Sequence, residues 1–374
     1  MTPAPRARLL YGDSQHCPDI LYATGHHIPD PFLWFEIAGD AAVIVSPLEV
    51  SRAREALSSR AEVIGFEDAR ERYGAKSSSV YDQIFAISCH CGIRAWQVGA
   101  DFPLALARRL EHNGICVWTA DDAFFPERAV KTAQEVEHLR EGVELAETGM
   151  YAAFEILGEA TVEGDFLNWQ QQRLTADILR GEINAAIARK GGLANHTIVA
   201  PGRYGADPHS EGAGPILANH PTVIDIFPRV VRTGYFGDLT RTVVKGTPSD
   251  IVCRAYDSVH KSRALGISMI KDGVLASNVH ESVAQSMEDD GFETDAKSAT
   301  PHGFFHGTGH GLGLEIHEAP RVGRNKSPLQ AGNVVTVEPG LYYPEWGGMR
   351  LEDVVVIEPD GCANLTTVRT ELVI

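Results

Sequence analysis

The sequence predicts an α+β protein built from two domains. Its 374 residues exceed what one hydrophobic core usually organises. Residues 1–128 alternate short apolar runs with helical stretches, which is typical of a small α/β domain. Residues 129–374 combine long amphipathic helices with several runs that resemble antiparallel strands, which indicates an α+β domain.

The amino-terminal domain is predicted from alternating strand and helix patterns. Apolar runs rich in β-branched residues indicate strands, and apolar residues at helical spacing indicate helices. The predicted elements are strands at 41–47 and 62–66 and helices at 48–60 and 102–114. The last of these helices ends at Gly114, a residue type that commonly follows a helix in the left-handed conformation.

The second domain follows a boundary near residues 126–131. Its predicted helices span 131–160, 165–190, 249–271 and 277–290. Ser277 or Asn278 is the expected cap of the last helix. Its predicted strands are TVIDIF (222–227), YFGDLTRTVV (235–244), VVTVEPGLYY (334–343) and MRLEDVVVIE (349–358).

Composition excludes several classes of function. A formal charge of −17 argues against nucleic-acid binding, which requires basic residues on phosphates. No apolar stretch reaches the roughly 20 residues that span a bilayer. The amino terminus lacks the apolar segment of a secretory signal, so we expect a cytoplasmic protein. Cys89-His90-Cys91 lacks a second ligand pair for zinc and is interpreted as the end of an apolar strand.

Four acidic residues occur inside predicted apolar strands, where a lone charge is costly unless it is paired or binds a metal. They are Asp225, Asp238, Glu338 and Glu352. One such acid usually has a structural arginine partner, but four of them beside a histidine cluster indicate a cation site. A turn between the two aspartates would place them side by side on neighbouring strands.

The segment 302–320, HGFFHGTGHGLGLEIHEAP, supplies the histidine cluster. Its histidines are His302, His306, His310 and His317. Carboxylates together with imidazole suit a pair of divalent ions such as Mn²⁺, Co²⁺, Fe²⁺ or Zn²⁺. A pair of such ions activates water near neutral pH.

These segments resemble the signature segments of the pita-bread metallopeptidases, a family that includes aminopeptidase P, prolidase, methionine aminopeptidase and the metal-free creatinase. The resemblance is carried by VIDI, GYFGDLTRTVV, HGTGHGLGLEIHEAP, VVTVEPGLYYP and GGMRLEDVVVI. It covers residues 130–374 and implies a curved antiparallel sheet flanked by helices. More weakly, residues 1–128 resemble the amino-terminal domain of the creatinase, prolidase and aminopeptidase P branch.

The resemblance implies a role for each matched residue. Two divalent ions, with Mn²⁺ as first choice, would be held by Asp225, Asp238, His310, Glu338 and Glu352. Glu338 would also accept a proton during water attack. The other implied roles are contact with the scissile amide for His209, oxyanion stabilisation for His317, orientation of the site for Arg350 and a place on the substrate side for His306. A satisfied loop histidine is the alternative for His209, and a polar wall residue is the alternative for His306.

The implied substrate is a peptide cut before proline, by a prolidase or by an aminopeptidase P. Arg321 or Arg324 would bind the free carboxylate of a dipeptide. The alternatives are a hydrolase of a small non-peptide compound and a non-catalytic binding scaffold. The resemblance also implies a homodimer.

One feature departs from the family. Twelve residues separate Asp225 from Asp238 where ten are usual, and Phe227-Pro228 replace the expected Gly-Ala. Two extra residues leave side-chain parity unchanged, so both aspartates are expected to face the site, while the rim of the pocket changes.

Overall fold

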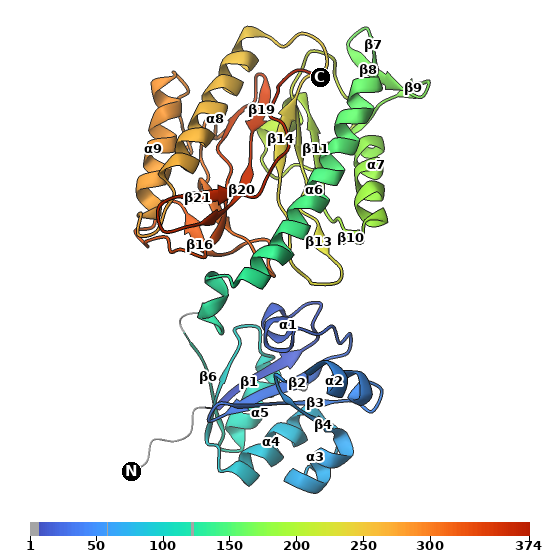
Figure 1. The fold of residues 1–374 in the computed structure, drawn as a ribbon, viewed down its shortest axis with the longest axis vertical. Helices are drawn as coiled ribbons and strands as arrows, with labels where there is room; N and C mark the ends of the chain where they lie inside the picture. Colours follow the sequence, from blue (N-terminus) through green and yellow to red (C-terminus); the bar gives the residue numbers. More distant parts are fainter. Residues whose placement is uncertain (1–6, 58, 121–122) are drawn as a thin grey trace. The chain divides into compact units, whose positions relative to one another are not determined.

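The computed structural model describes residues 7–57, 59–120 and 123–374 (Figure 1). Contacts divide the chain into two compact units, Met1–Pro126 and Glu127–Ile374. The sequence predicted this boundary between residues 128 and 129, which is two residues after the observed one. Among the described residues, no helix is long and apolar enough to cross a membrane.

The first unit is built on a mixed six-stranded sheet in the order β4-β3-β2-β1-β5-β6. β1, β2 and β3 pair antiparallel, and the outer strands pair parallel. The strands are β1 (Ala7–Gly12), β2 (Phe32–Ile37), β3 (Asp40–Val45), β4 (Glu62–Gly65), β5 (Ala95–Val98) and β6 (Cys116–Thr119). The helices are α1 (Pro18–Thr24), α2 (Val50–Leu57), α3 (Phe66–Tyr73), α4 (Val80–Cys91) and α5 (Leu104–His112). The predicted strands at 41–47 and 62–66 and the helices at 48–60 and 102–114 are confirmed within a few residues.

The interpretation of Cys89-His90-Cys91 as the end of a strand was wrong, because these residues end helix α4. Ser79 caps this helix by accepting a hydrogen bond from the backbone N–H of Asp82, and Gly92 follows it with a φ of 68°. Ile84 and Ile87, three positions apart, are fully buried against the sheet, whereas both cysteines are exposed. Helical spacing therefore describes the segment better than strand alternation.

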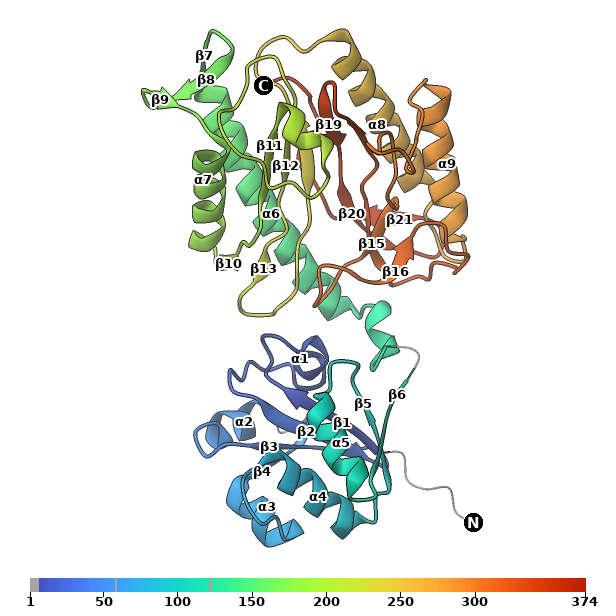
Figure 2. The ribbon, with the colours of Figure 1, turned by 180° about the vertical axis from the view of Figure 1, so that it is seen from behind.

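The second unit places two helix pairs around antiparallel strands (Figures 1 and 2). The helices are α6 (Ala133–Glu159), α7 (Ala176–Arg189), α8 (Asp250–Met269) and α9 (Ala276–Asp289). α6 packs on α7 and α8 packs on α9, with β11, β12, β14 and β20 between the pairs. Thr132 and Glu135 form a capping box at the start of α6.

Antiparallel pairing joins the strands of this unit in several short sheets, which agrees with the predicted α+β class. The strands that build the site are β11 (Ile198–Pro201), β12 (Thr222–Asp225), β14 (Thr240–Val243), β15 (Gly309–Gly311), β16 (Glu318–Val322), β17 (Val334–Val337), β18 (Gly340–Tyr343), β19 (Gly347–Arg350) and β20 (Asp353–Ile357). The others are β7 (Thr161–Glu163), β8 (Phe166–Trp169), β9 (Gln172–Arg173), β10 (Gly192–Leu193), β13 (Arg229–Val230) and β21 (Cys362–Asn364).

The helix predicted over 165–190 begins eleven residues later, at Ala176. Residues 161–173 form the small sheet β7-β8-β9 instead. Gln170 and Gln171 adopt left-handed conformations with φ of 48° and 62°, which a helix does not permit. Thr175 then caps α7 by accepting from the N–H of Ile178.

The predicted caps Ser277 and Asn278 of the last helix were also wrong. α9 already begins at Ala276, so both residues lie inside its first turn. Leu275 occupies the cap position and provides no side-chain hydrogen bond.

Candidate active site and metal centre

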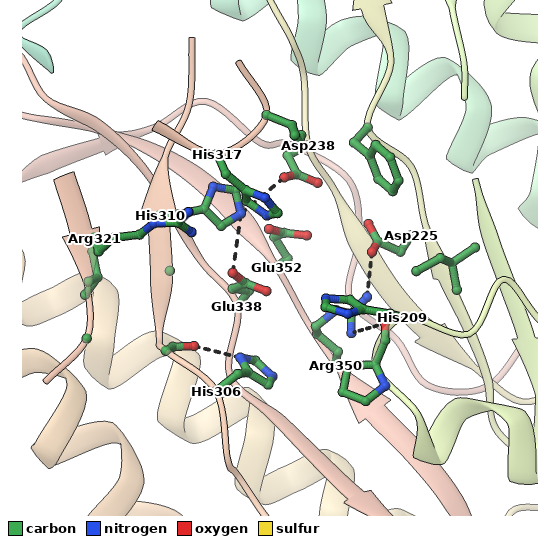
Figure 3. Close-up of a pocket in the computed structure, with 18 of the residues that line it drawn as sticks. His209, Asp225, Asp238, His306, His310, His317, Arg321, Glu338, Arg350 and Glu352 are labelled. Atoms are coloured by element: carbon green, nitrogen blue, oxygen red, sulfur yellow. Dashed lines mark hydrogen bonds and ion pairs between the residues drawn. The ribbon is translucent and has the colours of Figure 1, made fainter. Parts of the chain in front are cut away.

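The second unit contains a cavity of about 890 Å³ that gathers almost every residue proposed for the site (Figure 3). The proposed residues that line it are His209, Asp225, Asp238, His306, His310, His317, Arg321, Glu338, Arg350 and Glu352. Arg324 and His302 are not among its lining residues. The cavity therefore distinguishes between the two arginines that the sequence left as alternatives.

The hairpin carrying Asp225 and Asp238 keeps one register along its whole length. Asp225 pairs with Thr240, and Asp238 lies two residues before this partner. The two aspartates are therefore diagonal neighbours. The sequence had suggested that they lie side by side as cross-strand partners. The ladder continues beyond β12, because Ile226 N–H donates to Leu239 O.

The cross-strand register continues through the twelve residues between the aspartates. Gly237 N–H donates to Pro228 O, and Arg229 pairs with Phe236, both in the register of β12 and β14. A change of two residues leaves each side chain on its original face. Both aspartates consequently line the same cavity.

Two glycines fix the backbone immediately before a proposed metal ligand. A Cβ at Gly237 would lie 1.9 Å from the carbonyl oxygen of Gly142 in helix α6, and Asp238 follows directly. A Cβ at Gly309 would lie 1.9 Å from the carbonyl oxygen of Thr336, and His310 follows directly. Only glycine allows backbone segments to approach this closely, so these contacts position the next side chain.

Asp238, His310 and Glu352 form the centre of the acidic cluster. One ligand atom from each lies within 4.8 Å of those of the other two. Nε2 of His310 is 3.6 Å from Asp238 and 3.4 Å from Glu338 (Figure 3). Glu352 accepts a hydrogen bond from the hydroxyl of Thr240 at 2.7 Å. This donor set of buried carboxylates and one imidazole suits divalent cations.

Asp225 adjoins this centre and is held by Arg350. The guanidinium donates to Oδ2 of Asp225 at 2.5 Å. The other oxygen, Oδ1, is buried and has no hydrogen-bond partner. An unpartnered buried carboxylate oxygen is costly, and coordination to a cation would satisfy it. The residues present therefore fit a metal centre.

The pKa values of the cluster residues also indicate a cation site. Burial raises the pKa of Asp238 and of Glu352 well above the usual carboxyl range, and the neighbouring carboxylates raise both further. Burial likewise raises the pKa of Glu338 to about 7. Burial and the neighbouring His317 lower the pKa of His310 to about 3, so its imidazole is neutral and able to coordinate. A cation would offset the repulsion among the acids.

A hydrogen-bonded chain leads from Asp225 to His306. Arg350 donates from Nη1 to the hydroxyl of Tyr342 at 3.0 Å and from Nε to the hydroxyl of Thr240 at 3.2 Å. The Tyr342 hydroxyl lies 2.8 Å from Nε2 of His306, and Nδ1 of this histidine lies 2.7 Å from the carbonyl of Gly307. Both ring nitrogens of His306 are thus bonded within the protein, which favours a wall residue over a free proton donor.

The sequence did not single out Tyr342 or Thr240, although both contact Arg350. Tyr342 stands beside Tyr343 in the same strand, and composition does not separate the two. Strand alternation does: Tyr342 is fully buried facing the site, and Tyr343 points away from it. Burial raises the pKa of Tyr342 to about 12, so its hydroxyl stays protonated.

His209 and His317 line the cavity as well. The rings of His310 and His317 have centroids 4.3 Å apart. His209 and His317 are exposed to the cavity, which leaves their ring nitrogens accessible to a ligand. Burial lowers the pKa of His317, which favours a neutral ring with one N–H donor.

The comparisons with known proteins agree with this geometry. The model that describes metallopeptidase family M24 matches residues 137–359. The chain belongs to this family.

Relatives of this M24 metallopeptidase include an uncharacterised peptidase of Bacillus subtilis, 32% identical over 66% of this chain and 65% of that protein. An Xaa-Pro dipeptidase of Pyrococcus furiosus is 30% identical over 67% of each chain. Among solved structures, an Xaa-Pro dipeptidase from Bacillus anthracis superposes with a TM-score of 0.81 at 21% identity, covering 99% of this chain and 95% of that one. That match shows the fold. Membership of the family implies divalent metal ions at the buried Asp/His/Glu cluster.

Removing metal from this M24 metallopeptidase will make its stability fall as pH rises. The folded-state pKa values of Asp238, Glu338 and Glu352 lie above those of unfolded carboxyls, so their stabilisation is present at low pH and is lost as pH rises. For Glu338 the loss is complete once the pH exceeds its folded pKa of about 7. Glu338 alone would contribute roughly 3 kcal/mol between pH 4.5 and 8. Urea unfolding of chelator-treated protein across this range measures the effect.

The metal-loaded protein is the control, and its stability should not fall over the same range. The variant Glu338→Gln, without metal, should show a smaller loss than the unchanged chain. Equal pH dependence with and without metal would contradict a cation site at this cluster.

Proposed function

We propose that this chain is a metal-dependent peptidase that hydrolyses the bond before proline. The observation that carries the proposal is the acidic cluster of Asp225, Asp238, His310, Glu338 and Glu352, which lines a cavity of about 890 Å³. Family membership supports the reaction class, and the names of the related Xaa-Pro dipeptidases support the substrate.

The five cluster residues would hold two divalent ions, whose Lewis acidity polarises a carbonyl and lowers the pKa of water. The cations also lower the pKa of Glu338, which favours its ionised form. In that form Glu338 can accept a proton from the attacking water and return it to the leaving nitrogen.

His317 and His209 are proposed to contact the peptide itself. Neutral His317 donates an N–H to the oxygen that becomes negative during attack. His209 faces the same cavity and is proposed to contact the scissile amide. Arg350 is proposed to act through Asp225, which it keeps oriented through the 2.5 Å bond.

Arg321 supports a dipeptidase over an aminopeptidase that acts on longer peptides. It pairs with His310 across β15 and β16, so its guanidinium enters the cavity beside the cluster. Figure 3 shows Arg321 and Asp225 on opposite sides of the acidic residues. A guanidinium there can bind the terminal carboxylate of a dipeptide.

Replacing Arg321 by alanine should raise KM for Ala-Pro by about tenfold or more and should change kcat less, because the bond to the carboxylate exists before and during reaction. Steady-state kinetics with the dipeptide measure this. Arg324→Ala is the matched control: this arginine is exposed, lies three residues away and stays outside the cavity. An unchanged KM in Arg321→Ala would remove Arg321 from the site.

The proposed function is tested with Ala-Pro and Ala-Pro-Ala, using chelator-treated protein with and without added Mn²⁺. Metal-dependent cleavage of the dipeptide alone supports a dipeptidase, and cleavage of both supports an aminopeptidase. Failure to cleave either peptide by protein with metal bound would contradict the proposal. A screen of small amides and amidines would then address the non-peptide alternative.

We also propose that the metal is manganese, that the chain assembles as a homodimer and that the protein is cytoplasmic. The carboxylate-rich ligand set supports Mn²⁺ among the candidate ions. Metal analysis of protein purified without added metal tests the first, light scattering tests the second and cell fractionation tests the third.

A further inference from the structure

One aromatic side chain of the cavity has no part in the proposed chemistry. Phe227 follows Asp225 by two residues and stands opposite Asp238 in the continuous register of the hairpin. Strand alternation therefore directs it to the same face as both aspartates. It lines the cavity and is only half-buried, so part of its ring surface is open to a ligand.

Ile198 adjoins this surface from the neighbouring strand and is itself only 6% exposed. It pairs with Asp225 from the other neighbouring strand, β11, and it also lines the cavity. Phe227 and Ile198 thus border the aspartates from two strands. Phe227 occupies the position where the resemblance predicts glycine.

The position of this wall relative to the peptide follows from Arg321. Arg321 is the cross-strand partner of His310. Phe227 lies on the other hairpin, next to Asp225 and Asp238. This step rests on the proposed function: with the dipeptide carboxylate at Arg321 and the scissile bond at the cluster, the first residue extends toward Phe227.

We propose that Phe227 makes this enzyme select dipeptides whose first residue has an apolar side chain, such as Leu-Pro. Covering the open part of the Phe227 ring with a leucine side chain removes apolar surface from water. A dipeptide that begins with glycine leaves that surface exposed to solvent. A hydrophobic contact of this size changes kcat/KM by about tenfold to a hundredfold.

The experiment compares kcat/KM for Leu-Pro and Gly-Pro with the full chain loaded with Mn²⁺. We expect the unchanged protein to prefer Leu-Pro by at least about tenfold. Phe227→Gln, which keeps the size but loses the apolar ring, should reduce the preference to less than about threefold, and Phe227→Leu should retain most of it. Phe236→Ala is the matched control, because Phe236 is half-buried on the same hairpin outside the cavity.

Each outcome is decisive. An unchanged preference in Phe227→Gln, or no preference in the unchanged protein, overturns this inference while leaving the proposed function intact. Absence of cleavage of both dipeptides overturns the proposed function and this inference with it. Should Phe227→Gln fail to fold, Phe227→Ala removes the same ring, and an unchanged preference in that variant overturns the inference as well.

Discussion

Replacing Asp238 by asparagine lowers kcat/KM for Ala-Pro by at least about a thousandfold. Asp238 is 4% exposed, and its carboxylate lies within 4.8 Å of the ligand atoms of His310 and Glu352. The carboxamide carries no charge and coordinates cations weakly. Steady-state kinetics give the activity, and elemental analysis of the purified variant should show that bound metal falls by at least half.

The same variant should fold well, which separates loss of chemistry from loss of structure. Burial and the adjacent acids already raise the pKa of Asp238, so without metal its charge is unfavourable. A neutral side chain of the same shape removes this repulsion. Metal-free Asp238→Asn should therefore be at least as stable as the metal-free unchanged chain at pH 8. Normal metal content with activity within tenfold would show that Asp238 is no ligand.

Replacing Asp353 by asparagine should have the opposite effect: a loss of about 3 kcal/mol in the free energy of unfolding, with metal binding retained. Asp353 is 2% exposed and accepts from Arg241 at 2.8 Å and from Arg263 at 3.1 Å. Both arginines are buried, so the substitution leaves two charges without their carboxylate. Urea unfolding of the metal-loaded variant measures the loss.

Asp290→Asn serves as the comparison for an exposed pair. Asp290 bonds Lys261 at 2.6 Å, and the lysine side chain is 56% exposed, so the expected loss is below about 1 kcal/mol. A similar loss in both variants would contradict the structural role of Asp353. Bound metal in Asp353→Asn should equal that of the unchanged chain, because its carboxylate faces the arginines.

Glu352 and Asp353 illustrate how much of the site could be predicted from the sequence. Both acids lie in one apolar segment, and strand alternation directs adjacent side chains to opposite faces. The matched motif selected Glu352 for the site, and the structure places Glu352 in the cavity and Asp353 against two arginines. The chemical roles of the lining residues stay predictions until the variants are measured.

Local patterns were sufficient for most helices and strands, because spacing and capping act within a few residues. They failed where the local sequence is compatible with both a helix and a strand, as in the helical segment ending at Cys91 and the strands of 161–173. The parity argument for the longer hairpin succeeded, since it depends only on the two-residue period.

The sequence by itself determined the α+β class, the acids within apolar strands and the histidine motif that together indicate a metallopeptidase. Only the tertiary structure decided which of Arg321 and Arg324 enters the cavity, that Tyr342 joins Arg350 to His306, and that Phe227 faces the aspartates. The physical reason is distance along the chain. Arg350 and Asp225 are 125 residues apart, and their hydrogen bond forms only when strands from separate segments pack together.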